Sequence, residues 1–473
     1  MPLIFVSAIT LILVIVSAAA FWRVFPNYIF GSVVKGSLVA LDIFFIILGA
    51  IFFLEIMKET KIIENVSFYL QSVSKDIRIQ VIFLAWFFEN FLEGTAGFGT
   101  PSTVVAPLLI GLGLGPVNAV IIALLGNSSS VVFGAAGTPI RVGLGELAPS
   151  SLPLTAALIN SIGIIVPVFI LWFLTAKRQN GQKLFWEALP FAVWAGIAFC
   201  LPSILIVFLG QEFPSILGAV VGLVLVLLTT KLKIFVPKNV ELQHAEKSGE
   251  APIPIVKVAF PYALLIVFLV AGKFLIGSGG LFLPLLVKHT IAYFNPGFAF
   301  ILAGILTLGV FGMGIKTLGS SLKLALKRSI EPFLVIAFMS SIAQIMVNSV
   351  HNYSFQPSMI DFMAIQAKNV LLPLWAPVIG AFGSFLTGSA TVSNLMFGNF
   401  LAHAAGDLGL AVDKILALAL VGAAAGNMIA LADVIAAEAV VGLRNEENKI
   451  LRGVIIPCAI YVILVGAVGL IIT

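Results

Sequence analysis

Long apolar segments, separated by short polar ones, run through almost the whole chain. The clearest of them cover residues 3–22, 37–57, 79–92, 115–140, 151–176, 187–209, 213–230, 256–276, 298–315, 330–348, 371–386, 411–432 and 453–472. Shorter or interrupted ones cover residues 95–112, 281–295 and 392–405. A helix needs about 20 apolar residues to cross the hydrocarbon core of a bilayer. The pattern therefore predicts an all-α polytopic membrane protein with about 12–14 transmembrane helices.

The first apolar segment ends in Ser17-Ala18-Ala19-Ala20, which resembles the cleavage site of a signal peptide. No basic region precedes this segment, and further apolar segments follow it. Because a signal peptide has a basic region ahead of its apolar core, we interpret the segment as the first transmembrane helix.

A polar stretch at residues 231–257 interrupts the apolar pattern and contains lysines, glutamates and three prolines. We interpret it as a cytoplasmic linker between a first half, residues 1–230, and a second half, residues 258–473, because basic residues accumulate in cytoplasmic loops. Four further basic clusters lie at residues 58–78, 177–183, 316–328 and 444–452. All five clusters can be cytoplasmic if the segment 281–295 does not cross the membrane.

Two similar motifs occur far apart in the chain. Residues 90–101 and 384–394 share Phe-Leu-x-Gly followed by small residues, and each copy is followed by a Gly-Asn pair, at Asn127 and Asn427. The basic clusters place the start of the first copy on the cytoplasmic side and the start of the second on the outside. We therefore predict two inverted-topology repeats, an arrangement found in many secondary transporters.

Residues 93–101 are unsuited to an uninterrupted membrane helix, since they include three glycines, two threonines, a proline and a carboxylate. Backbone groups left unpaired in lipid cost several kcal/mol each. We predict a broken helix or re-entrant hairpin in each repeat, with Thr100 as helix N-cap and Pro101 as first helical residue. Such a helix N-terminus favours an anion such as a carboxylate. The alternative is close packing of small residues between helices.

Polar side chains in and beside the two motifs are candidates for substrate binding. Hydroxyl and amide groups there could bind a small polar substrate, or could only join helices. Arg141 could hold a substrate carboxylate through its planar guanidinium, or could anchor a helix at the membrane interface. The candidates are Gly97, Gly99, Thr100, Asn127, Ser128, Ser129, Arg141, Thr387, Ser389, Thr391, Asn394 and Asn427.

Ionisable side chains within membrane segments are functional hypotheses by default. Glu93 and Asp433 are the candidates for ion coupling, because each lies beside a repeat motif. A carboxylate in an apolar site can carry a proton near neutral pH. Helix ends or interfaces would explain the remaining intramembrane acids, which are Asp42, Glu55, Glu89 and Glu438.

Composition excludes several classes of protein. Hydrophobic residues make up 60% of the chain and charged residues 10%, against about 25% charged residues in soluble domains. A soluble enzyme, a disordered protein and a nucleic-acid-binding module are therefore excluded. The chain has no GxxxxGK[ST], H-E-x-x-H or G-x-S-x-G motif, so we expect neither ATP-driven transport nor an enzyme. The spacing of its two cysteines and four histidines suggests no metal site, and we expect no cofactor.

The motif residues resemble those of the L-lactate permease family. Residues 93–101 resemble its E-G-A-A-G-F-G-T-P, and residues 127–140 resemble its N-T-A-P-V-A-F-G-A-x-G-x-P-I. Residues 385–394 resemble F-L-T-G-S-D-T-S-S-N, and residues 426–442 resemble the glycine–lysine–methionine–isoleucine run that follows. The resemblance covers nearly the whole chain. It implies a secondary transporter with paired hairpins in a mobile transport domain.

Three positions depart from the family pattern. Ala390 replaces an aspartate, Asn427 replaces a lysine, and Arg141 stands where the family has an apolar residue. If the aspartate and the lysine form an ion pair in the family, their joint loss avoids leaving one buried charge unpaired. Asp433 is additional relative to the pattern and could take the place of the missing aspartate. These departures leave open a different substrate or coupling ion.

The resemblance implies proton-coupled symport of L-lactate and related 2-hydroxymonocarboxylates such as glycolate across the inner cell membrane. The departures keep a second hypothesis, a Na⁺-coupled carrier of another organic anion such as a dicarboxylate. A passive anion channel is a third, although a channel would need a continuous polar or charged ring. The expected partners are the anion, the proton or Na⁺, and the lipid bilayer, without nucleic acid. A homodimer is one assembly that the sequence allows.

Overall fold

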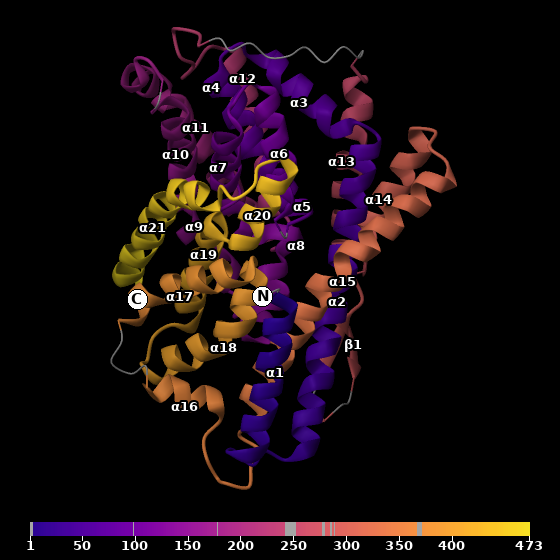
Figure 1. Cartoon of the computed structure of the whole chain (residues 1–473), viewed down its shortest axis with the longest axis vertical. Helices are drawn as coiled ribbons and strands as arrows, with labels where there is room; N and C mark the ends of the chain where they lie inside the picture. Colours follow the sequence, from indigo (N-terminus) through magenta and orange to yellow (C-terminus); the bar gives the residue numbers. More distant parts are fainter. Residues whose placement is uncertain are drawn as a thin grey trace. The chain divides into compact units, whose positions relative to one another are not determined.

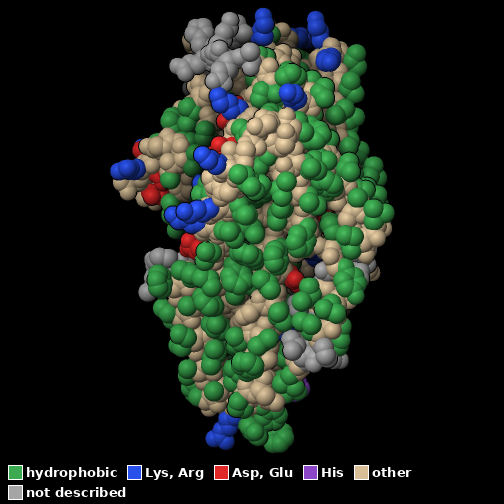
Figure 2. Space-filling view, turned by 90° about the vertical axis from the view of Figure 1, so that its right-hand side faces the viewer, with side chains coloured by type: hydrophobic (Ala, Val, Ile, Leu, Met, Phe, Trp, Pro, Cys, Tyr) green, Lys and Arg blue, Asp and Glu red, His purple; other side chains and the backbone are tan. Residues whose placement is uncertain are grey.

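The computed structural model describes residues 3–97, 99–176, 178–241, 252–276, 280–283, 286–287, 289–366 and 371–473. Eight of the described helices are long and apolar enough to cross a bilayer, or nine if the bent pair Pro116–Gly126 and Ser129–Leu147 counts as one span. Hydrophobic side chains cover most of the face seen in Figure 2, as expected for contact with lipid. The predicted all-α polytopic fold is confirmed. The predicted 12–14 spans are reached only when shorter apolar helices, such as Ile4–Ala20, are included.

The chain forms two compact units, and each takes segments from both ends of the sequence. The first unit comprises Met1–Asn65 and Pro252–Asn369, so the units cut across the predicted repeat halves, residues 1–230 and 258–473. Its elements are α1 (Leu3–Ala20), α2 (Pro26–Glu59), α13 (Ile255–Ala271), the π-helical segment η7 (Gly272–Ile276), β1 (Gly280–Leu283), β2 (His289–Ala292), α14 (Pro296–Val310), α15 (Ile315–Asn348) and α16 (Met359–Gln366) (Figure 1).

Within the first unit, α2 is fixed by a close backbone contact and by an ion pair. It packs against α14 where a Cβ added at Gly49 would lie 2.3 Å from the Gly297 carbonyl oxygen. Such small-residue contacts are typical of membrane helices. Near its end, Glu55 pairs with Arg328 of α15 at 2.5 Å and with Lys58 at 3.4 Å. These ion pairs give Glu55 a structural role.

The segment 281–295 does not supply a membrane helix among its described residues. β1 and β2 form an antiparallel pair in which Gly280 lies opposite Ala292 and Leu283 lies opposite His289. An open two-stranded sheet would leave unpaired backbone groups in lipid, so it cannot span the bilayer alone. The described residues of this segment agree with the condition that it does not cross the membrane, and the cytoplasmic placement of the five basic clusters stays a prediction.

The second unit comprises Val66–Ala251 and Val370–Thr473, and it contains both copies of the motif. Its elements before the linker are α3 (Ile62–Val73, which begins in the first unit), α4 (Ile77–Ile82), η1 (Phe83–Phe88), α5 (Glu89–Thr95), α6 (Thr100–Gly111), α7 (Pro116–Gly126), η2 (Ser129–Phe133), α8 (Gly134–Thr138), η3 (Pro139–Leu144), η4 (Gly145–Leu147), α9 (Leu152–Asn160), η5 (Ser161–Ile165), α10 (Val166–Thr175), α11 (Gly181–Ile206), η6 (Val207–Leu209) and α12 (Pro214–Lys231). After the linker come α17 (Leu372–Thr387), α18 (Ala390–Asp407), α19 (Val412–Gly426), η8 (Asn427–Ile429), α20 (Leu431–Val440) and α21 (Glu447–Ile472).

The two copies have the same order of helices and breaks. In the first, α5 breaks before α6, and α7 ends at Gly126 before a second break. In the second, α17 breaks before α18, and α19 ends at Gly426 before a second break. The broken helices predicted from the glycine-rich motifs are therefore present in both copies.

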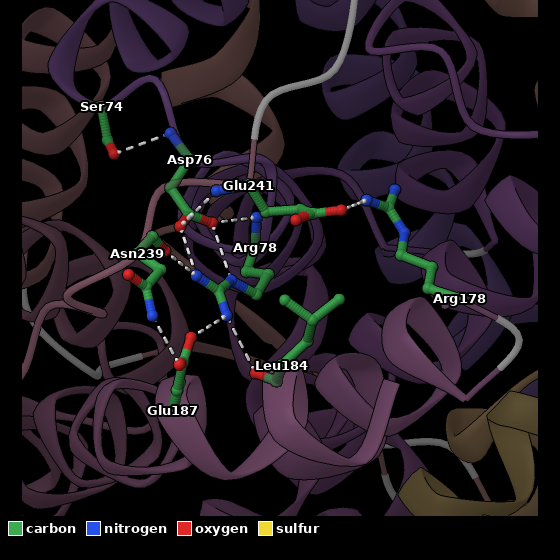
Figure 3. A network of polar contacts seen from close by, with 8 residues as sticks. All are labelled: Ser74, Asp76, Arg78, Arg178, Leu184, Glu187, Asn239 and Glu241. Carbon is green, nitrogen blue, oxygen red and sulfur yellow. Dashed lines mark hydrogen bonds and ion pairs between the residues drawn. The ribbon is translucent and has the colours of Figure 1, made fainter. Parts of the chain in front are cut away.

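A buried ion-pair network fixes the start of the first broken helix (Figure 3). Arg78, 1% exposed, donates to both carboxylate oxygens of Asp76, at 3.0 and 2.6 Å, and to the Leu184 carbonyl at 2.9 Å. Burial alone would lower the pKa of Arg78, but its hydrogen bond to Asp76 and the nearby Glu187 and Glu241 raise that pKa above its usual value. Arg78 therefore remains charged while it joins α4 to α11.

The same network holds the beginning of the predicted linker. Arg78 donates to the Asn239 carbonyl at 2.6 Å, and the Glu241 backbone nitrogen donates to Asp76 at 3.3 Å. Arg178 pairs with Glu241 at 3.2 Å. Residues from three predicted cytoplasmic segments thus meet at one place, as expected if they share one side of the membrane. Residues 242–251 of the linker lie outside the described part of the chain.

We expect Arg78→Ala to lower the thermal stability of the detergent-solubilised protein strongly. It leaves the buried Asp76 carboxylate without its cation, a change that costs about 3–5 kcal/mol in comparable pairs. Arg178→Ala is the matched control, because its ion pair is partly exposed and such pairs contribute about 0–1 kcal/mol. Equal midpoints of thermal unfolding for the two variants would contradict the assigned role of Arg78.

Candidate functional site

The first break is made possible by two glycines with left-handed backbone conformations. Gly97 has φ +58° and Gly99 has φ +70°, values that L-residues with a Cβ adopt only at a cost. Gly99 is also required for space, since an added Cβ would lie 2.1 Å from Oδ1 of Asp433. The break therefore brings the start of α6, in the first copy, against a carboxylate of the second copy.

Thr100 does not cap α6 as predicted. The helix starts at Thr100 itself, and the capping position is Gly99. The Thr100 hydroxyl and backbone nitrogen both donate to the Gly97 carbonyl, at 2.7 and 3.1 Å. The left-handed Gly99 makes this tight turn possible, so the hydroxyl closes the turn instead of capping the helix.

The second break is held by hydroxyl groups. Gly388 is left-handed, with φ +70°, and Ser389 caps α18 by accepting from the Val392 nitrogen at 3.4 Å. The Thr387 hydroxyl donates to the Gly383 carbonyl at 2.8 Å and to the Ser389 carbonyl at 3.1 Å. Thr387 thus stabilises the break, while Ser389 and the start of α18 face the space beside it.

A small cavity lies between the two breaks, within the second unit. Its volume is about 20 Å³, which is room for about one water molecule. The first copy lines it with Glu93, Gly97, Val131, Gly134, Ala135 and Pro139, and the second with Gly388, Ser389, Ala390, Thr391 and Asn427. Both copies of the motif thus meet at one site, and lactate would need a wider cavity than this.

Each copy contributes a buried carboxylate and a neighbouring amide. Glu93 lies near Asn127 and Asp433 lies near Asn427, and the two acids are close enough to interact electrostatically. Oε2 of Glu93, Oδ2 of Asp433 and both amide atoms of Asn127 have no hydrogen-bond partner among the described residues. Because unpaired buried polar groups are costly, these atoms are available to a bound ion or polar substrate.

Space for the Glu93 carboxylate depends on a further glycine. A Cβ added at Gly134 would lie 2.3 Å from Oε1 of Glu93. Gly134 lies at a bend after η2, followed by Ala135 and Ala136 in left-handed conformations.

Other predicted site residues hold the surrounding backbone. The Ser128 hydroxyl donates to the Leu125 carbonyl at 2.7 Å. The Ser129 carbonyl accepts from Asn160 at 2.9 Å, and Asn394 donates to the Pro139 carbonyl at 3.0 Å. These residues are not among those that line the cavity, although Asn394 ties η3 of the first copy to α18 of the second.

Arg141 lies in η3, is partly exposed, and does not belong to the residues that line the cavity. Of the sequence-based candidates, the cavity directly includes Glu93, Gly97, Ser389, Thr391 and Asn427. Sequence reasoning missed Gly134 and Gly388 as lining residues, and it ranked Glu89 below Glu93. Glu89 and Glu93 are four residues apart, and this spacing could have revealed that they lie on the same face of the helix.

No group of three His, Cys, Asp or Glu side chains that could hold a metal ion occurs among the described residues. Cys200 and Cys458 are buried free thiols. The polar side chains that line the cavity are a carboxylate, two hydroxyls and an amide.

The chain is similar to a well-defined group of bacterial transport proteins. A family model described as L-lactate permease matches residues 1–276 and 282–473. The L-lactate permease of Escherichia coli (strain K12) is 28% identical over 97% of this chain and 90% of its own length. Glycolate permease GlcA of the same organism is 27% identical over 98% and 90%, and the L-lactate permease of Streptococcus iniae is 27% identical over 78% of each chain.

A solved structure shares the fold at much lower sequence identity. The YdaH transporter of Alcanivorax borkumensis, described as having an unusual topology, matches 99% of this chain and 98% of its own with a TM-score of 0.54 and 13% identity. The apolar helices and the bacterial lactate permease relatives together make the chain a multi-pass protein of the cell membrane.

We expect Gly99→Ala to destabilise the first break. The added methyl group would meet Asp433 at 2.1 Å, and the left-handed backbone alone costs about 1–2 kcal/mol for a residue with a Cβ. Gly111→Ala, later in α6, is the control, since nothing lies within 4 Å of its added Cβ. A thermal unfolding midpoint of Gly99→Ala that is no lower than that of Gly111→Ala would argue against this geometry.

Proposed function

The chain belongs to the L-lactate permease family, and we propose that it is a secondary active transporter that carries L-lactate and related small 2-hydroxymonocarboxylates, such as glycolate, together with a proton. The observation that carries this proposal is the cavity between the two helix breaks, which is lined by Glu93. Asp433 does not line the cavity, but it lies close enough to Glu93 to interact with it electrostatically. Its residues serve binding and translocation, with no catalytic step.

The two carboxylates supply a physical basis for coupling. An anionic substrate in the cavity would be repelled by ionised Glu93 and Asp433, and protonation removes that repulsion. Proton binding and substrate binding then favour each other, which is the thermodynamic requirement for symport. Both acids are buried, and none of the described ion pairs involves them.

Donor side chains for the substrate come from the second copy. Ser389, Thr391 and Asn427 line one wall of the cavity and offer hydroxyl and amide groups to a carboxylate and a 2-hydroxyl group. The starts of α6 and α18 lie at the two breaks, and the positive ends of helix dipoles favour an anion there. Because all these residues belong to one compact unit, the site can move as one body.

A second candidate, a Na⁺-coupled carrier of another organic anion such as a dicarboxylate, is favoured by two substitutions. Ala390 and Asn427 stand where the family pattern has an acid and a base, and both line the cavity. Their side chains therefore face the site where cargo and coupling ion would bind. A competition panel of mono- and dicarboxylates, under separate proton and Na⁺ gradients, distinguishes the two candidates.

We expect proteoliposomes containing the protein to accumulate labelled L-lactate when a pH gradient drives uptake. Glu93→Gln should reduce this accumulation about tenfold or more, because an amide cannot release and rebind the coupling proton. Absence of L-lactate flux under every gradient tested would reject the substrate, and unchanged pH-driven uptake by Glu93→Gln would remove Glu93 from coupling.

A further inference from the structure

A third buried carboxylate near the site, that of Glu89, lies one helical turn before Glu93 on α5. Glu89 is the first residue of α5, where the π-helical segment η1 ends, and its side chain is fully buried. Glu93 follows four residues later, so the two carboxylates project from the same face of the helix about one turn apart. Glu93 reaches the cavity, whereas Glu89 is not among the residues that line it.

The surroundings of Glu89 leave part of its carboxylate unpaired. Oε1 accepts a hydrogen bond from the Ser102 hydroxyl of α6 at 3.1 Å. Oε2 has no hydrogen-bond partner among the described residues. It faces Gly126, where an added Cβ would lie 2.7 Å away, so this glycine leaves room beside the oxygen. The next residue, Asn127, is fully buried with both amide atoms unpaired, and it lies near Glu93.

No described cation neutralises this carboxylate. The titratable group that acts on Glu89 from the elements packed around it is Glu93, which carries the same charge. The buried guanidinium group of Arg78, in the second unit, is paired with Asp76 at the start of α4. Two ionised carboxylates in one apolar site would repel each other and lack solvation. A bound proton relieves both costs.

We propose that Glu89 is a second proton-binding position, one helical turn behind Glu93, and that it receives the coupling proton from Glu93. This inference rests on the proposed function of proton-coupled transport. In the transfer, the O–H bond on the Glu93 carboxyl breaks and an O–H bond forms on Oε2 of Glu89. The negative charge moves from Glu89 to Glu93, and no other reactant is needed.

The unpaired atoms around the two acids suit this transfer. The Asn127 amide lies near Glu93 and offers both a donor and an acceptor, so it suits the ionised and the protonated form of that carboxyl group. Ser102 holds Oε1 of Glu89, which leaves Oε2 as the oxygen that takes up the proton. Glu89 also lies on the side of Glu93 that leads to α4 and the predicted cytoplasmic loop.

The transport test compares Glu89→Gln with Glu89→Asp in proteoliposomes, with Glu438→Gln as the matched control. Glu438 is a buried acid of the same unit whose carboxylate accepts from the Glu446 nitrogen at 2.7 Å, a bond that glutamine can also accept. We expect Glu89→Gln to keep the exchange of labelled for unlabelled L-lactate. Its accumulation of L-lactate under a pH gradient should be about tenfold lower than that of the wild type. Glu89→Asp should restore accumulation, and Glu438→Gln should retain it.

The outcomes separate this inference from the proposed function. If the wild-type protein exchanges no L-lactate, the proposed function fails. If the wild type transports and Glu89→Gln accumulates L-lactate normally, the second position is wrong. Uptake by the wild type under a Na⁺ gradient at uniform pH, lost in Glu89→Gln, would overturn the assignment of a proton.

A spectroscopic test does not depend on the substrate. Infrared difference spectra of the solubilised protein, recorded as pH is changed, report the C=O stretch of protonated carboxyl groups. We expect the wild type and Glu438→Gln to share a titrating band that Glu89→Gln lacks. A spectrum of Glu89→Gln identical to that of the wild type would show that Glu89 carries no titrating proton and would overturn the proposal.

Discussion

The hydrocarbon interior of a bilayer offers no water to unpaired polar groups, so each interrupted helix and each buried charge must be satisfied within the protein. This constraint organises the second unit. Its helices break where hydroxyls and carbonyls close the turns, as Thr100 does with Gly97 and Thr387 does with Ser389. The two breaks meet at one cavity, so exposed backbone is confined to a place where a polar ligand can bind.

Several buried polar atoms around this cavity have no hydrogen-bond partner among the described residues. They include oxygens of Glu89, Glu93 and Asp433 and the amide of Asn127. Elsewhere, buried charges have partners, as Arg78 has in Asp76 and Glu55 has in Arg328. The three acids around the cavity thus differ from these paired charges, as is expected when the site is completed by a ligand and a proton.

Sequence patterns predicted the membrane class, the broken helices and the pairing of the two motifs, because glycine, proline and carboxylates stand out against apolar segments. They could not predict which polar groups face the cavity. Thr100 and Asn394 were candidates for substrate binding, yet both hold backbone carbonyls, since the direction of a hydroxyl or amide depends on the turn that carries it. The two compact units were also unforeseen, because contacts between distant helices leave no periodic signal in the sequence.

The contact between Glu93 and Gly134 has a consequence for variation among related proteins. Unlike Gly99, Gly134 has a negative φ of −64°, so its backbone would accept a side chain. Only the Glu93 carboxylate, 2.3 Å from the added Cβ, excludes one. The two positions are therefore expected to co-vary: a relative with a shorter residue at position 93 is free to carry alanine at position 134, whereas glycine at position 99 is retained whichever acid faces it.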